Sequence, residues 1–184
     1  MALLIWGLVL FIGIHLLPSV DRLRRAISER LGEPAYKILF SLVSAAGLIL
    51  IGIGYGRASH EQIFEPSRTA RTFLPIAMAI AFVLVAVANV PGRVRRAIHH
   101  PMLAGVLIWA TFHLLANGDL ASNVMFGTFA LWVVFAILSA EYRGKRPGSS
   151  QGSFKADAVG AVVGLALFWL VFHFHASLFG VSPV

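Results

Sequence analysis

Residues 99–119 read HHPMLAGVLIWATFHLLANGD, and this stretch decides the class of protein to which the chain belongs. Most of it is apolar enough to lie in a lipid bilayer, yet His113 and Asn117 stand inside or at the end of the apolar run. An unpaired polar group in hydrocarbon costs on the order of several kcal/mol, so the imidazole needs a partner or a metal. Trp109, His113 and Asn117 are spaced four residues apart, and we expect their shared helix face to point into a bundle.

The same pattern extends over the chain, of which 58% is apolar and 12% charged. A membrane-spanning helix needs about 20 apolar residues, which a hydropathy window of about 19 residues detects. Six segments meet this requirement, near residues 3–20, 35–56, 73–90, 102–117, 121–140 and 157–179, and the fourth is the shortest. We therefore predict an all-α polytopic membrane bundle of about six transmembrane helices, with residues 1–184 as a single domain. The small residues of the second segment, among them Gly47, Gly52, Gly54 and Gly56, predict close helix packing.

The basic residues predict the orientation of the bundle. Twelve of the 15 lysines and arginines lie in the first, third and fifth predicted loops, which should therefore be cytoplasmic. Both termini are then expected on the extracytoplasmic side. The net charge of +7 lies beside apolar runs, so we expect membrane lipids and no nucleic acid as partners.

Histidine is the residue type that carries the candidate chemistry. The chain has no cysteine, which excludes disulfides, thiol nucleophiles, iron-sulfur clusters and covalently attached haem. His15 and His113 both lie inside apolar runs, and two imidazoles in a helical bundle are typical of axial haem ligation. His60 lies in a polar loop and is interpreted as a surface histidine. His99 and His100 precede Pro101 at a helix entrance, where capping and a functional role stay open.

Several long motifs identify the chain as resembling the NnrU family, which is also similar to zeta-carotene isomerases of plants and cyanobacteria. The motifs are GIHLLPSVDRLR (13–24), RLGEPAYKILFSLVSAAGLILIGIGYGR (30–57), VPGRVRRAIHHPMLAGVLIWATFHLLANGDLASNVMFGTFALW (90–132) and HASLFGV (175–181). The resemblance implies a multi-pass protein of the bacterial cell inner membrane. The NnrU branch is associated with denitrification and nitric oxide metabolism.

For the isomerase branch, the resemblance implies a non-covalent haem b. Its ligands are a first-helix histidine and the histidine of a W-x-x-x-H segment, which match His15 and His113. The isomerases carry a cysteine directly after the tryptophan, linked to a redox-dependent exchange of haem ligands. This chain has Ala110 there, so the resemblance does not extend to that exchange.

The depth of the histidines in the bilayer opens alternatives to the pairing of His15 with His113. His15 lies near the cytoplasmic end of its predicted span and His113 near the opposite end of its own, whereas two ligands of one iron need nearly equal depth. Depth alone would pair His15 with His100, or His113 with His173 or His175. A haem on the cytoplasmic side would have arginines for its propionates, at positions 22, 24, 25, 93, 95 and 96.

Two neighbours of His113 have both structural and functional interpretations. Asn117 and Gly118 suit the left-handed end of a helix, with Asp119 as the cap of the next one, but Asn117 also lies where it would orient the His113 imidazole. Trp109 would pack on a porphyrin face or fill the core.

We predict a haem b-binding membrane protein for nitric oxide-linked redox chemistry or sensing, with nitric oxide or a hydrophobic small molecule as ligand. The alternatives are an isomerase of a hydrophobic polyene such as a carotenoid, and an assembly factor without haem for a denitrification enzyme. A further alternative follows from residues 96–101, which resemble the R-H-P segment of membrane methyltransferases and sterol reductases. Those enzymes need acidic residues at the cytoplasmic surface, where this chain offers Glu141 and Asp157.

Overall fold

The computed structural model describes residues 1–144 and 152–180, and within them the chain is helical without a β-strand. The elements are α1 (Ala2–Leu16), the 3₁₀ turn η1 (Leu17–Ser19), α2 (Asp21–Leu31), α3 (Glu33–Gly56), α4 (Arg68–Val87), α5 (Arg93–Ile98), α6 (Pro101–Asn117), α7 (Leu120–Tyr142) and α8 (Phe154–Phe179). Five segments of at least 18 residues are apolar enough to cross a membrane: α3, α4, α7, α8, and α1 continued through η1. The apolar helix α6 is shorter, with 17 residues. The predicted helical membrane bundle is confirmed, and so is the short fourth span.

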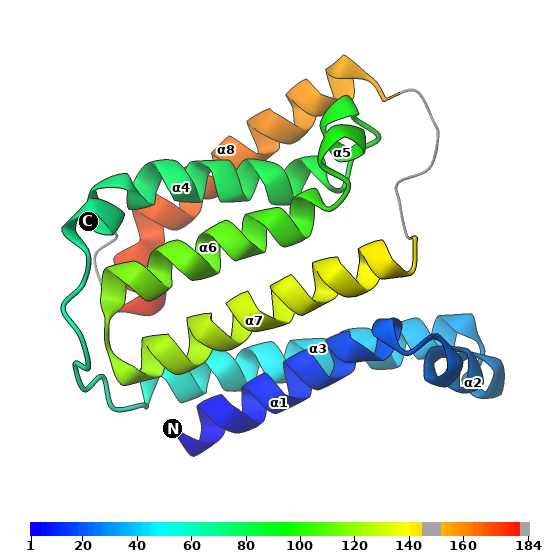
Figure 1. The fold of residues 1–184 in the computed structure, drawn as a ribbon, viewed down its shortest axis with the longest axis horizontal. Helices are drawn as coiled ribbons and strands as arrows, with labels where there is room; N and C mark the ends of the chain where they lie inside the picture. The colour runs from blue at the N-terminus through cyan, green and yellow to red at the C-terminus, as the bar shows by residue number, and fades with distance from the viewer. Residues whose placement is uncertain (145–151, 181–184) are drawn as a thin grey trace.

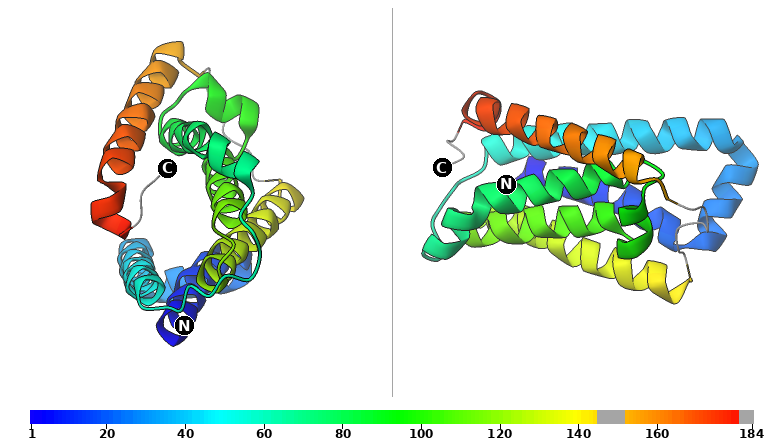
Figure 2. Two further views of the ribbon diagram at one scale, coloured as in Figure 1. Left: turned by 90° about the vertical axis from the view of Figure 1, so that its left-hand side faces the viewer. Right: turned by 90° about the horizontal axis from the view of Figure 1, so that it is seen from above.

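The bundle has two packed groups joined by α7 (Figure 1). Helix α1 packs along α3, while α4 packs on both α6 and α8. Helix α7 lies between these groups, with α6 on one side and α1 on the other. Helices α6 and α8 end at the end of the bundle where α1 begins (Figures 1 and 2). This common end is the one predicted to be extracytoplasmic. The first helix begins there and the last helix ends there, because the chain runs along the bundle an even number of times.

Close contacts between backbones hold α1 on α3. A Cβ atom added to Gly7 would lie 2.6 Å from the Ile51 nitrogen, and one added to Gly54 would lie 2.6 Å from the Leu4 Cα. Gly47 faces Phe11 in the same way. The predicted role of small residues is thus confirmed for Gly47 and Gly54. It is wrong for Gly52 and Gly56, where a Cβ would meet nothing within 4 Å, because they lie on the other face of α3.

Helix α2 lies across the end of the bundle, where the sequence analysis had placed a loop (Figure 2). Pro18 lies in the 3₁₀ turn that ends α1, so the first span does not continue straight into α2. Helix α2 has Asp21 in its first turn and Arg30 in its last, which suits the helix dipole. Arg143 of α7 donates to the Pro18 carbonyl oxygen and fixes this corner.

Candidate functional site

His15 and His113 lie at the two ends of a column of aromatic rings in the bundle. The column consists of Phe11 on α1, Trp109 on α6, and Phe126, Phe129 and Trp132 on α7. His15 stacks on Phe11 with ring centroids 4.2 Å apart, and His113 stacks on Phe126 at 4.8 Å. Trp109 contacts Phe126 at 4.9 Å and Phe129 at 5.3 Å, so it fills the core of this column.

Each of the two imidazoles is fixed by the turn of helix that precedes it. His15 Nδ1 lies 2.7 Å from the Phe11 carbonyl oxygen, and His113 Nδ1 lies 2.9 Å from that of Trp109. A carbonyl oxygen only accepts, so Nδ1 carries the proton and donates it. The remaining nitrogen, Nε2, then presents a lone pair from a neutral ring, which is the state in which histidine ligates a metal.

The column separates His15 from His113. His15 contacts Trp132 at 5.5 Å, whereas His113 stacks on Phe126, six residues earlier on the same helix. Six residues of helix span about 9 Å. Phe129 lies between these two contacts and touches Phe11 at 5.5 Å. The difference in depth expected from the sequence is therefore present, and the shared ligation of one iron by His15 and His113 stays a prediction.

His175 on α8 lies at the same end of the bundle as His113 on α6. His113 lies four residues before the end of α6 and His175 four before the end of α8, so the two rings lie at similar depth. His173 is exposed on α8 and stacks on Trp169 at 5.3 Å. Of the two α8 histidines considered from depth alone, His175 is half-buried and His173 is exposed, and the pairing of either one with His113 stays a prediction.

The turn after α6 has the structural role expected for it. Gly118 adopts the left-handed conformation, with φ of 73°, and Asp119 accepts a hydrogen bond from the Ser122 nitrogen as the cap of α7. Asn117 is the last helical residue, and its carbonyl oxygen accepts from the Gln62 side chain at 3.0 Å. The suggested action of Asn117 on the His113 ring stays a prediction.

The loop between α3 and α4 is tied to this turn by a partly buried polar network. His60 Nδ1 lies 2.9 Å from Asp119 Oδ1, and His60 Nε2 lies 3.1 Å from the Tyr55 carbonyl oxygen. The Tyr55 hydroxyl pairs with the fully buried Ser122 hydroxyl at 2.8 Å. His60 is exposed, as expected for a surface histidine, but it also closes this loop over the end of the bundle. Sequence reasoning missed the pairing because its partners are 59 residues apart.

The network makes the bundle sensitive to acid. Burial by itself raises the pKa of the Asp119 carboxyl, but hydrogen bonds from Ser122 and the pairing with His60 outweigh it and hold the pKa below its ordinary value. A lowered pKa in the folded state stabilises the fold above about pH 3.9, and this stabilisation is lost as the pH falls through the folded-state pKa. We expect the thermal unfolding midpoint in detergent to fall steeply below about pH 4.

The Asp119→Ala variant tests this origin of the acid sensitivity. At pH 7 it should lose about 1–2 kcal/mol of stability, the usual effect of removing a helix cap, and its midpoint should depend less on pH. Glu65→Gln removes a carboxylate at an exposed position of the neighbouring α3–α4 loop and is the control. If the unfolding midpoint of Asp119→Ala still falls below about pH 4 as much as that of the unmodified protein, another group causes the acid sensitivity.

At the predicted cytoplasmic end, two histidines share one carboxylate. Glu141 Oε1 lies 3.1 Å from His100 Nε2 and 3.5 Å from His99 Nδ1. Pro101 is the first residue of α6, as expected, and His99 has a positive φ of 57° in the tight turn before it. The His100 side chain is thus held by Glu141, and its suggested pairing with His15 stays a prediction.

The acidic residues considered for an R-H-P type cofactor site have partners within the chain. Asp157 is buried and accepts from the backbone nitrogens of Arg93 and Val94, at 2.8 and 3.2 Å, so it caps α5. Glu141 binds the two histidines described above. Both carboxylates therefore stabilise the fold of the α5–α6 corner, which disfavours the methyltransferase or reductase alternative.

Fold and site together define a multi-pass helical membrane protein with half-buried imidazoles in its bundle. The chain belongs to the NnrU family, because the family described as NnrU protein matches residues 3–183. No curated protein and no solved structure matches the chain. The resemblance to the NnrU family is thus confirmed, whereas the relation to zeta-carotene isomerases stays a prediction.

Proposed function

We propose that this protein binds haem b at the extracytoplasmic end of its bundle and acts in nitric oxide-linked redox chemistry or sensing in the bacterial inner membrane. The observation that carries the proposal is the geometry of His113. Its Nδ1 donates to the Trp109 carbonyl oxygen, and His175 lies at the same end of the bundle, four residues before the end of α8. The association of the NnrU family with denitrification supplies the biological context.

The residues present fit the chemistry of haem. The imidazole of His113 would present its Nε2 to the iron, and the Trp109 and Phe126 rings beside His113 suit an apolar macrocycle. Farther along the column, the Trp132 indole nitrogen is buried and has no hydrogen-bond partner among the described residues. This donor lies beside His15, whose role as a haem ligand stays a prediction.

The two histidines of the proposed site would have different roles. His113 lies on α6, which packs between α4 and α7, and its ring is fixed by the Trp109 carbonyl oxygen. His175 lies on α8, which packs mainly on α4 at the rim of the bundle. A haem held there would supply one-electron redox chemistry and a binding site for nitric oxide. We propose that His175 would hold the haem less firmly than His113, because α8 packs mainly on one neighbouring helix.

Visible spectra of the purified protein test the proposal. The protein would be expressed with added haem precursor, purified in mild detergent, and measured in the oxidised, reduced and nitric oxide-exposed states. We expect a low-spin Soret band, near-stoichiometric haem b in a pyridine haemochrome assay, and a shift of the band with nitric oxide. Absence of the band despite adequate haem would contradict the proposal and favour the assembly-factor alternative.

A further inference from the structure

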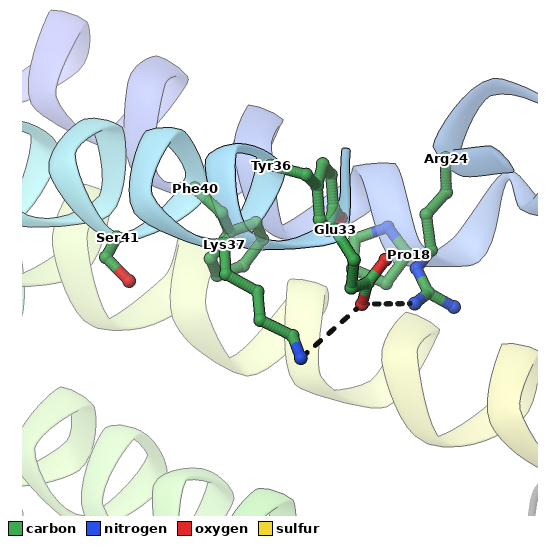
Figure 3. A pocket seen from close by; sticks show the side chains of 7 residues that line it. All are labelled: Pro18, Arg24, Glu33, Tyr36, Lys37, Phe40 and Ser41. Atoms are coloured by element: carbon green, nitrogen blue, oxygen red, sulfur yellow. Dashed lines mark hydrogen bonds and ion pairs between the residues drawn. The ribbon is translucent and has the colours of Figure 1, made fainter. Parts of the chain in front are cut away.

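We propose that a pocket at the predicted cytoplasmic end of the bundle binds the phosphate group of an anionic phospholipid. The pocket has a volume of about 470 Å³ and lies where η1 and α2 meet the first turns of α3 (Figure 3). Its lining residues are Pro18, Arg24, Glu33, Tyr36, Lys37, Phe40 and Ser41. This proposal is independent of haem binding.

The pocket carries a net positive charge. Arg24 and Lys37 converge on the single carboxylate of Glu33, with nitrogen-to-oxygen distances of 3.4 and 3.6 Å (Figure 3). The second Glu33 oxygen accepts a hydrogen bond from the Ser28 hydroxyl. Two cations therefore share one anion, and one positive charge is left over.

Most of the hydrogen-bond donors of these two cations are still available. One guanidinium nitrogen of Arg24 contacts Glu33, although the group carries five N–H donors. The Lys37 side chain is 70% exposed, and its ammonium nitrogen lies 3.6 Å from Glu33. A phosphate group, with several acceptor oxygens, fits this combination of a fork and a point charge better than a second carboxylate does.

The order of polar and apolar groups along α3 favours a lipid over a free anion. Glu33 and Lys37 lie in the first turns of α3, and Phe40 and Ser41 follow one turn deeper. Phe40 and Pro18 give the pocket an apolar wall that a soluble phosphate would not use. An amphiphile with its charge at the headgroup level and its chains below would contact both parts.

The surroundings of the pocket place it in the leaflet that carries anionic lipids. The amphipathic helix α2, which carries Arg22, Arg25 and Arg30, lies across this end of the bundle. The excess of basic residues predicts that this end is cytoplasmic, and the cytoplasmic leaflet attracts such segments through its negative lipids. Phe40 lies against His15 at 5.0 Å and separates the pocket from the aromatic column, so the pocket is distinct from the proposed haem site.

Retention of lipid by the intact protein tests the proposal. The protein would be reconstituted in nanodiscs of phosphatidylcholine with a minor share of phosphatidylglycerol, released into detergent, and measured by native mass spectrometry. The Arg24→Gln, Lys37→Gln double variant should retain about tenfold less phosphatidylglycerol than the unmodified protein. The Arg22→Gln, Arg30→Gln double variant loses the same charge from exposed positions on α2 and should change retention less than about threefold.

Three outcomes would overturn the proposal. An equal loss in both double variants would mean diffuse attraction to the surface. Displacement of phosphatidylglycerol by millimolar inorganic phosphate would assign the site to a free anion. Loss of haem from the pocket variant with unchanged lipid retention would assign Arg24 and Lys37 to haem carboxylates. If the double variant does not fold, Lys37→Gln alone gives the same comparison, with Arg30→Gln as its control. Within the described part of the chain, the ion pair of Lys37 is with Glu33, so this single change disturbs little else.

Discussion

Replacement of His113 by alanine is expected to remove haem b from the protein. The imidazole of His113 is fixed by two neighbours: its Nδ1 donates to the Trp109 carbonyl oxygen, and its ring stacks on Phe126. Loss of a group that merely supports a metal ligand costs about 10–100-fold in affinity, so loss of the ligand itself should cost at least about 100-fold. The measurement is the ratio of Soret absorbance to protein absorbance after purification.

Alanine variants of the other histidines distinguish the possible ligand pairs. His175→Ala should keep haem, because His113 would still hold it. It should lose the low-spin spectrum and bind nitric oxide faster, because His175 is the proposed second and more weakly held ligand. His173→Ala is the matched control, since it removes an exposed imidazole two residues away on the same helix. His15→Ala should keep the low-spin spectrum. If His15→Ala changes the spectrum and His175→Ala does not, the pairing of His15 with His113 implied by the resemblance is correct and ours is wrong.

Replacement of Gly54 by leucine is expected to be the most destabilising single change in the α1–α3 pair. The first side-chain carbon would lie 2.6 Å from the Leu4 Cα and 2.7 Å from the Leu3 carbonyl carbon. These are backbone atoms, so no rotation of a side chain relieves the collision. Overpacking of a core costs about 1–3 kcal/mol, and here the helices must separate, so we expect about 3 kcal/mol or more. The measurement is the free energy of unfolding in mixed detergent micelles.

Gly52→Leu provides the control for this prediction. Gly52 lies on the same helix, and its Cβ would meet nothing within 4 Å. The same change there adds an apolar side chain to a face already rich in exposed leucine and isoleucine, so stability should change little. Equal destabilisation by both variants would show that glycine flexibility, and not the close contact with α1, is what α3 requires.

Sequence patterns predicted the spans well but missed what lies between them. The apolar runs are long and bounded by charges, which explains the agreement for α3, α6 and α8. Helix α2 was interpreted as a loop because its eleven residues, DRLRRAISERL, are mostly polar, although Asp21 in the first turn was an available signal. For the candidate site, the sequence selected His15, His113 and His175, but it did not contain the distances that separate the first two.

The sequence by itself determined that this is a helical membrane protein of the NnrU family. Hydrocarbon tolerates long apolar helices and few polar groups, so the spans and the unusual position of His113 follow directly from the order of residues. Only the tertiary structure decided which polar groups meet. The contacts of His60 with Asp119 and of Glu141 with His100 join residues 59 and 41 positions apart, and helix packing alone brings them together.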